Sequence, residues 1–143
     1  MRNVRALVAL RKRQFEQAEQ ALAVVNAELN RLEEEKRKLR AMMRETALPA
    51  GGEGRLLGAV TMQRGAIAGA LKELEARIAA VRQARQEQER HLKAAHIALE
   101  QARSLESEAL QRLMRLKMRR ERGLMDEIAA RKFWLDNGEK EKL

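Results

Sequence analysis

The chain has 143 residues, of which 45% are hydrophobic and 36% charged, and its formal net charge is +9. Aromatic residues make up 2% and cysteine is absent, so the chain lacks the large side chains of a globular core and any disulfide or thiolate site. This composition is typical of long helical proteins and disfavours a compact enzyme.

The first part of the chain, about residues 2–46, is predicted to form one helix with a coiled-coil seam. With Met1 as heptad position a, the a and d positions keep one register for about six heptads and are apolar except at Arg11 and Lys36. Charges of both signs fill the other positions, which is typical of a solvated helix face. The predicted seam positions are Met1, Val4, Val8, Arg11, Phe15, Ala18, Leu22, Val25, Leu29, Leu32, Lys36, Leu39 and Met43.

A cluster of proline and glycine predicts a turn at about residues 47–56. These residue types break helices and favour tight turns. The cluster comprises Pro49, Gly51, Gly52 and Gly54.

A second, longer helix is predicted from about residue 57 to 135, followed by a C-terminal tail at 136–143. Glycine at position 123 costs about 1 kcal/mol relative to alanine, which a helix of this length tolerates. Its seam positions recur at spacings of three and four. They are Leu57, Val60, Arg64, Ile67, Leu71, Leu74, Ile78, Val81, Leu92, Ala95, Leu99, Ala102, Ala109, Leu113 and Leu116.

Two amphipathic helices joined by a short loop fold into an antiparallel pair. The predicted fold is therefore all-α, a single-domain, long two-helix antiparallel coiled-coil hairpin with an overhanging second helix. If Met43 faces Leu57, the numbers of facing residues add to about 100. Met1 would then lie near Leu99, and the second helix would be uncovered beyond about Arg103.

The predicted overhang is both apolar and basic. Burial of one Leu or Phe side chain contributes about 1.5–3 kcal/mol, so a segment this rich in exposed apolar residues indicates a partner. The partner could be an acidic protein surface or a second copy paired through residues 104–135. Nucleic acid is a third alternative, although the chain lacks zinc ligands, a basic region leading into a zipper and stacking aromatics. The basic residues are Arg112, Arg115, Lys117, Arg119, Arg120 and Arg122.

No pattern in the chain predicts catalysis, a metal or a cofactor. His91 and His96 are five residues apart, about 140° around a helix, so they do not face one metal. Residues 51–54 lack the Lys-Ser/Thr of a nucleotide-binding loop. The chain contains no apolar run of about 18 residues, and basic residues at 11–13 interrupt any signal-peptide core. We therefore expect a soluble cytoplasmic protein that is not an enzyme.

The start of the first predicted helix and the end of the second resemble those of a known protein family. The first helix opens on Leu7, Leu10, Arg11, Glu16, Ala18 and Leu22. The second helix ends in the run Met125-Asp126-Glu127-Ile128-Ala129-Ala130-Arg131. With the glycine-containing turn between them, these features resemble the flagellar export protein FliJ and its YscO-type relatives of virulence secretion, and more closely FliJ.

The resemblance implies a stalk-like component of the flagellar type III secretion apparatus. Such a protein inserts into the hexameric export ATPase, contacts the cytoplasmic domain of the export gate membrane protein and escorts export chaperones. It would be cytoplasmic, peripherally associated with the flagellar basal body at the inner membrane, and monomeric, with no nucleic-acid partner. The flagellar or virulence system is left open.

The resemblance also implies two sets of contact residues. The ATPase-ring residues would be Val4, Leu7, Val8, Arg112, Leu113, Arg115, Leu116, Arg119, Arg120, Met125, Asp126, Glu127 and Arg131. The export-gate residues would be Leu39, Met42 and Met43. The alternative functions are a self-associating structural coiled coil and a basic nucleic-acid-binding coiled coil.

Overall fold

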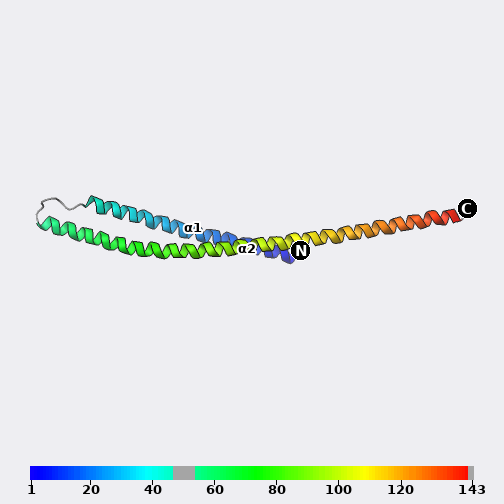
Figure 1. Ribbon diagram of the computed structural model, residues 1–143, viewed down its shortest axis with the longest axis horizontal. Helices are drawn as coiled ribbons and strands as arrows, with labels where there is room; N and C mark the ends of the chain where they lie inside the picture. The colour runs from blue at the N-terminus through cyan, green and yellow to red at the C-terminus, as the bar shows by residue number, and fades with distance from the viewer. Residues whose placement is uncertain (47–53, 142–143) are drawn as a thin grey trace. The chain divides into compact units, whose positions relative to one another are not determined.

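The computed structural model describes residues 1–46 and 54–141, which form two long helices (Figure 1). Helix α1 is Arg2–Glu45 and has 44 residues, whereas α2 is Gly54–Glu141 and has 88. The described residues contain no strand, and the predicted all-α helical hairpin is confirmed. Neither helix has, within these residues, a stretch apolar enough to cross a bilayer.

The observed helix bounds differ from the predicted ones at α2. The helix begins at Gly54 rather than near residue 57 and continues to Glu141, so the first part of the predicted tail is helical. No proline lies in α2 to stop it. The predicted turn at 47–56 falls partly outside the described residues, and its last three residues are helical.

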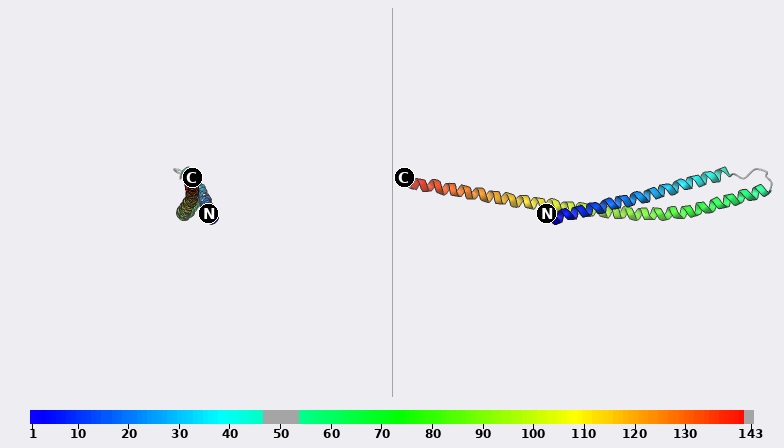
Figure 2. Two further views of the ribbon diagram at one scale, coloured as in Figure 1. Left: turned by 90° about the vertical axis from the view of Figure 1, so that its right-hand side faces the viewer. Right: turned by 180° about the vertical axis from the view of Figure 1, so that it is seen from behind.

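The chain divides into two compact units, which we describe separately. The hairpin unit is Arg13–Ile97, and the terminal unit is Met1–Lys12 together with Ala98–Leu143. In the hairpin unit α1 and α2 run side by side (Figures 1 and 2). Its core is a cluster of buried residues from both helices, against which Leu39 and Val81 pack. The cluster comprises Leu29, Leu32, Leu74 and Ile78.

Burial follows the heptad spacing closely. Every predicted seam position of α1 is partly or fully buried, and its seam is confirmed. In α2 the buried line runs from Val60 to Ala109 and also includes three polar positions that the apolar pattern left out. Leu57, also predicted as a seam position, is exposed, and that part of the prediction is wrong. Leu113 and Leu116, which continue the seam spacing into the predicted overhang, are exposed as expected there. The added polar positions are Arg85, Gln88 and Glu106.

Contacts between the helices of the hairpin unit correct the predicted register. Arg64 Nη1 donates to the carbonyl oxygens of Met43 at 3.2 Å and Thr46 at 2.7 Å. Further along, Phe15 and His96 bring their ring centroids within 5.6 Å. The numbers of facing residues therefore add to about 110 rather than 100. Arg64 faces the end of α1 because the last carbonyl groups of a helix lack intrahelical partners and accept its donors.

Candidate functional site

The candidate site lies in the terminal unit, where a short piece of α1 meets a longer piece of α2. Leu99 and Ala102 are buried, with exposed fractions of 3% and 2%. Val4, Leu7 and Val8, expected to contact an ATPase ring, are partly buried. These three side chains therefore present only part of their surface to a partner.

Beyond Ala109, α2 has no covering helix in the terminal unit. Every residue from Leu110 to Asp136 is exposed, and we call this stretch the uncovered segment. The prediction placed its start near Arg103, which is wrong by several residues because the register is shifted. The large apolar residues of the uncovered segment are Leu110, Leu113, Met114, Leu116, Met118, Leu124, Met125, Ile128, Phe133, Trp134 and Leu135.

Two faces of the uncovered segment differ in chemistry. At about 100° per residue, an apolar stripe runs along one side of the helix, and an arginine face lies roughly opposite. A partner can therefore contact an apolar surface on one side of the helix and positive charge on the opposite side. The apolar stripe is centred on Leu110, Met114, Leu124 and Ile128. The arginine face consists of Arg112, Arg115, Arg119 and Arg122, of which the first three also line a shallow groove with Leu116.

Large apolar residues also occur outside that stripe. Phe133, Trp134 and Leu135 are consecutive and are 64%, 75% and 69% exposed. Because consecutive helical residues point about 100° apart, these three side chains cover three sides of the helix. A flat partner cannot bury all three at once, whereas a partner that surrounds the helix can.

The charges of the uncovered segment have no ion-pair partners within the described residues. The last ion pair along α2 joins Arg103 to Glu100 at 3.1 Å. The segment also contains Asp126 and Glu127, both exposed, and Arg131, also exposed. With the arginine face, these predicted ring residues are all available to a partner.

The predicted gate residues lie in the hairpin unit and differ in exposure. Leu39 packs against the core cluster. Met43 is partly buried, and its carbonyl oxygen accepts the bond from Arg64. Met42 is 45% exposed, so it offers most of the free surface of this set.

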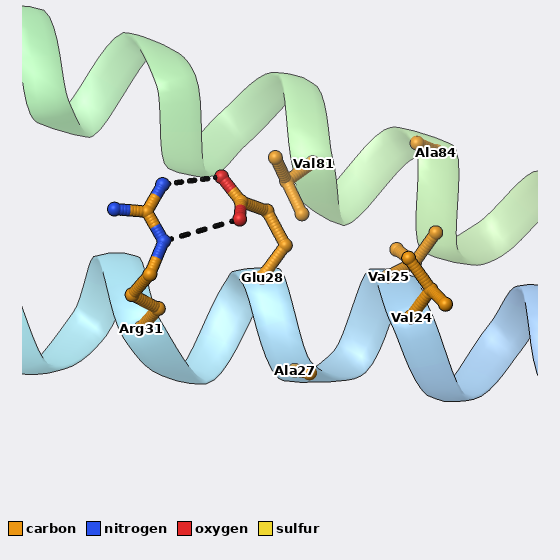
Figure 3. Close-up of a pocket in the computed structure, with 7 residues that line it drawn as sticks. All are labelled: Val24, Val25, Ala27, Glu28, Arg31, Val81 and Ala84. Carbon is orange, nitrogen blue, oxygen red and sulfur yellow. Dashed lines mark hydrogen bonds and ion pairs between the residues drawn. The ribbon is translucent and has the colours of Figure 1, made fainter.

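An apolar groove that the sequence reasoning missed lies between the helices of the hairpin unit (Figure 3). Val24 and Ala27 of α1 and Val81 and Ala84 of α2 line it. Adjacent apolar residues in both helices could have indicated it. At its edge Arg31 bonds both oxygens of a neighbouring glutamate (Figure 3), and these bonds lower the pKa of that carboxyl group. The glutamate is Glu28.

No metal site is evident in the described part of the chain. No group of three His, Cys, Asp or Glu side chains there is placed to hold a metal ion. His96 instead lies beside Phe15, with the two ring planes tilted by 48°. The geometry supports contact with another macromolecule.

The family comparison bears directly on this surface. A family model described as flagellar FliJ protein matches residues 1–138. The chain belongs to the FliJ family. No curated protein and no solved structure matches it. FliJ-family membership makes the protein a component of the flagellar export apparatus, in a family of export components rather than a known enzyme family.

Proposed function

We propose that this FliJ-family protein is the stalk of the hexameric export ATPase, with the uncovered segment inserted into the ring. The observation that carries the proposal is the apolar surface on several sides of one bare helix. Phe133, Trp134 and Leu135 point to three sides and are all exposed. A central channel of a ring surrounds a helix and can cover all of these side chains.

The two faces of the uncovered segment would stabilise this contact in different ways. Leu and Met side chains supply apolar area, and Met adapts to irregular surfaces, which suits a contact that changes as subunits move. Arginines of the opposite face would steer the helix toward acidic walls of the ring and form salt bridges at its rim. Val4, Leu7 and Val8 would complete the contact from α1.

Pairing with a second copy fits the uncovered segment less well. The heptad line through its apolar stripe also contains Lys117, Glu121 and Arg131. A two-stranded coiled coil would place these charges in its seam, where burial without partners is costly. A ring channel can leave them facing polar groups or water. We therefore favour a monomer in the ring and assign no role in nucleic-acid binding.

The proposal extends to the other partners of the export apparatus. The end of α1 near Leu39, Met42 and Met43 would contact the cytoplasmic domain of the export gate, with Met42 as the main contact. Export chaperones would be escorted by the same protein. It would work on the cytoplasmic side, associated with the flagellar basal body at the inner membrane.

The direct test measures ATPase turnover with the purified full-length protein. We expect it to promote hexamer formation and raise turnover of the cognate export ATPase. Trp134→Ser with Leu135→Ser should raise the concentration needed for half-maximal stimulation at least tenfold, because two buried apolar contacts are lost. The matched control, Val24→Ser with Ile97→Ser, also removes two exposed apolar residues and should stimulate like the parent. Equal behaviour of the two variants would contradict the stalk proposal.

A further inference from the structure

The described residues on either side of the turn form a second exposed apolar surface, in the hairpin unit. We call it the hairpin tip and define it as residues 36–46 of α1 and 54–62 of α2. Leu56, Leu57 and Met62 there are 56%, 44% and 79% exposed. No described residue of the hairpin unit buries them, because the buried seam of α2 starts only at Val60.

The hairpin tip is strongly basic. Arg37, Arg40 and Arg44 follow at i, i+3 and i+7, so they share one face of α1, and they line a shallow groove with Met43. Arg55 adds a charge from α2, in which no acidic residue occurs before Glu73. Glu75 forms long contacts to Lys36 and Arg40, at 3.8 and 3.9 Å. Among the described residues of the tip, Glu45 is the one acidic residue against six basic ones.

The helix ends add to this positive potential. The C-terminus of α1 would carry partial negative charge, but Arg64 donates to the carbonyl oxygens of Met43 and Thr46 and so offsets it. The first turn of α2 contains no acidic residue, so no side chain within that turn offsets the partial positive charge of its N-terminus. Both helices therefore contribute positive potential that attracts anions to the tip.

We propose that the hairpin tip binds the anionic phospholipid surface of a membrane. Leu56, Leu57 and Met62 would enter the boundary between headgroups and acyl chains, while the surrounding arginines contact lipid phosphates. This inference does not depend on the ATPase assignment, and its apolar contacts come from α2, whereas the proposed gate residues Leu39, Met42 and Met43 lie on α1.

The direction of the side chains favours lipid over an acidic protein. Leu56, Leu57 and Met62 point to three sides of α2, about 100–140° apart at helical spacing. A fluid interface closes around a helix end and accepts all three, whereas a flat protein surface covers one side. The uncovered segment is a poorer lipid ligand because it contains Asp126 and Glu127, which an anionic surface repels.

The test is flotation of the full-length protein with vesicles of phosphatidylglycerol and phosphatidylcholine, and with vesicles of phosphatidylcholine alone. We expect binding to the anionic vesicles only, weakened by added salt. Arg40→Gln, Arg44→Gln and Arg55→Gln together should lower the partition coefficient about a hundredfold. Leu56→Ser with Leu57→Ser should lower it about tenfold or more, without loss of helicity, because both side chains are exposed.

A charge-matched triple variant distinguishes the effect of the tip arginines from the effect of net charge alone. Arg13→Gln, Arg90→Gln and Lys93→Gln removes the same charge from exposed positions elsewhere in the hairpin unit and should reduce binding by less than fivefold. The proposal is overturned if the protein does not bind anionic vesicles, if it binds neutral vesicles equally well, or if the control variant loses as much vesicle binding as the tip variant. Binding to polyglutamate without binding to vesicles would also overturn it and would indicate an acidic protein partner.

Discussion

The hairpin unit and the uncovered segment use the same residue types in opposite ways. In the hairpin unit, Leu32 and Ile78 are buried to 1% and 2% exposure, and ion pairs such as Arg82–Glu33 at 3.2 Å join the two helices. In the uncovered segment, leucines of the same helix α2 stay exposed, and none of its described arginines has an ion-pair partner. The difference shows that α2 stabilises the fold along one part and leaves large apolar side chains exposed along another.

The largest effect should come from truncating the core of the hairpin unit. Leu32→Ala removes a fully buried side chain and should lower the free energy of unfolding by about 2–5 kcal/mol. Leu116→Ala, at a position 49% exposed, should change it by less than about 0.5 kcal/mol. Urea denaturation followed by circular dichroism measures both. Similar losses would mean that the uncovered segment is packed in solution.

Removing charge from the arginine face should weaken binding to the partner while leaving the stability of the fold nearly unchanged. Arg112→Gln, Arg115→Gln and Arg119→Gln together should leave the free energy of unfolding within about 0.5 kcal/mol, since these side chains are exposed. Affinity for the export ATPase should fall about ten- to a hundredfold and become less dependent on salt. Titration at two ionic strengths tests this, with Arg13→Gln, Arg90→Gln and Lys93→Gln as the charge-matched control. An equal loss in the control would indicate that net charge alone governs binding.

Arg64 should contribute to the stability of the hairpin unit through two hydrogen bonds. Arg64→Ala leaves the carbonyl oxygens of Met43 and Thr46 without this donor and should lower the free energy of unfolding by about 1–2 kcal/mol. Arg64→Lys keeps the charge but not the paired geometry and should recover part of the loss. Urea midpoints rank the three proteins, and a fully stable alanine variant would exclude this role for Arg64.

The smallest effect should be the pH dependence of one surface pair. Hydrogen bonds from Arg31 lower the pKa of Glu28 in the folded chain. The stabilisation is therefore present above the unfolded pKa of about 4.3 and is lost as pH falls through the lowered folded value. Glu28→Gln should cost a little stability at pH 7 and nothing at pH 2. Urea midpoints at both pH values test this, and a larger loss at pH 2 would contradict the assignment.

The sequence predicted local features better than long-range ones. Burial along α1 follows from heptad spacing, which is local, so its seam was predictable from Met1 to Met43. The register was not, because it depends on which residue of α2 meets the end of α1, and Arg64 occupies that place. Arg85 and Gln88 were missed because an apolar pattern cannot identify polar residues that share the seam.

The exposure of the uncovered segment was predictable from the sequence, but the residue at which it starts was not. An excess of apolar and basic residues near the C-terminus indicated a partner surface, and the residues from Leu110 to Asp136 are exposed as expected. The uncovered segment starts at Leu110 rather than near Arg103, because the observed register of the two helices differs from the predicted one. Heptad spacing does not reveal the exposed apolar residues at the hairpin tip, because it predicts Leu57 as a seam position, whereas Leu57 is 44% exposed.

Fluorescence of Trp134 tests the central claim most directly, because it is the only tryptophan of the chain and lies in the uncovered segment. The export ATPase would be used with its own tryptophans replaced by phenylalanine. If the segment enters the ring, the emission should shift to shorter wavelength and acrylamide quenching should fall, saturating at one protein per hexamer. Unchanged emission and quenching in a complex that co-elutes on size exclusion would contradict insertion of this segment.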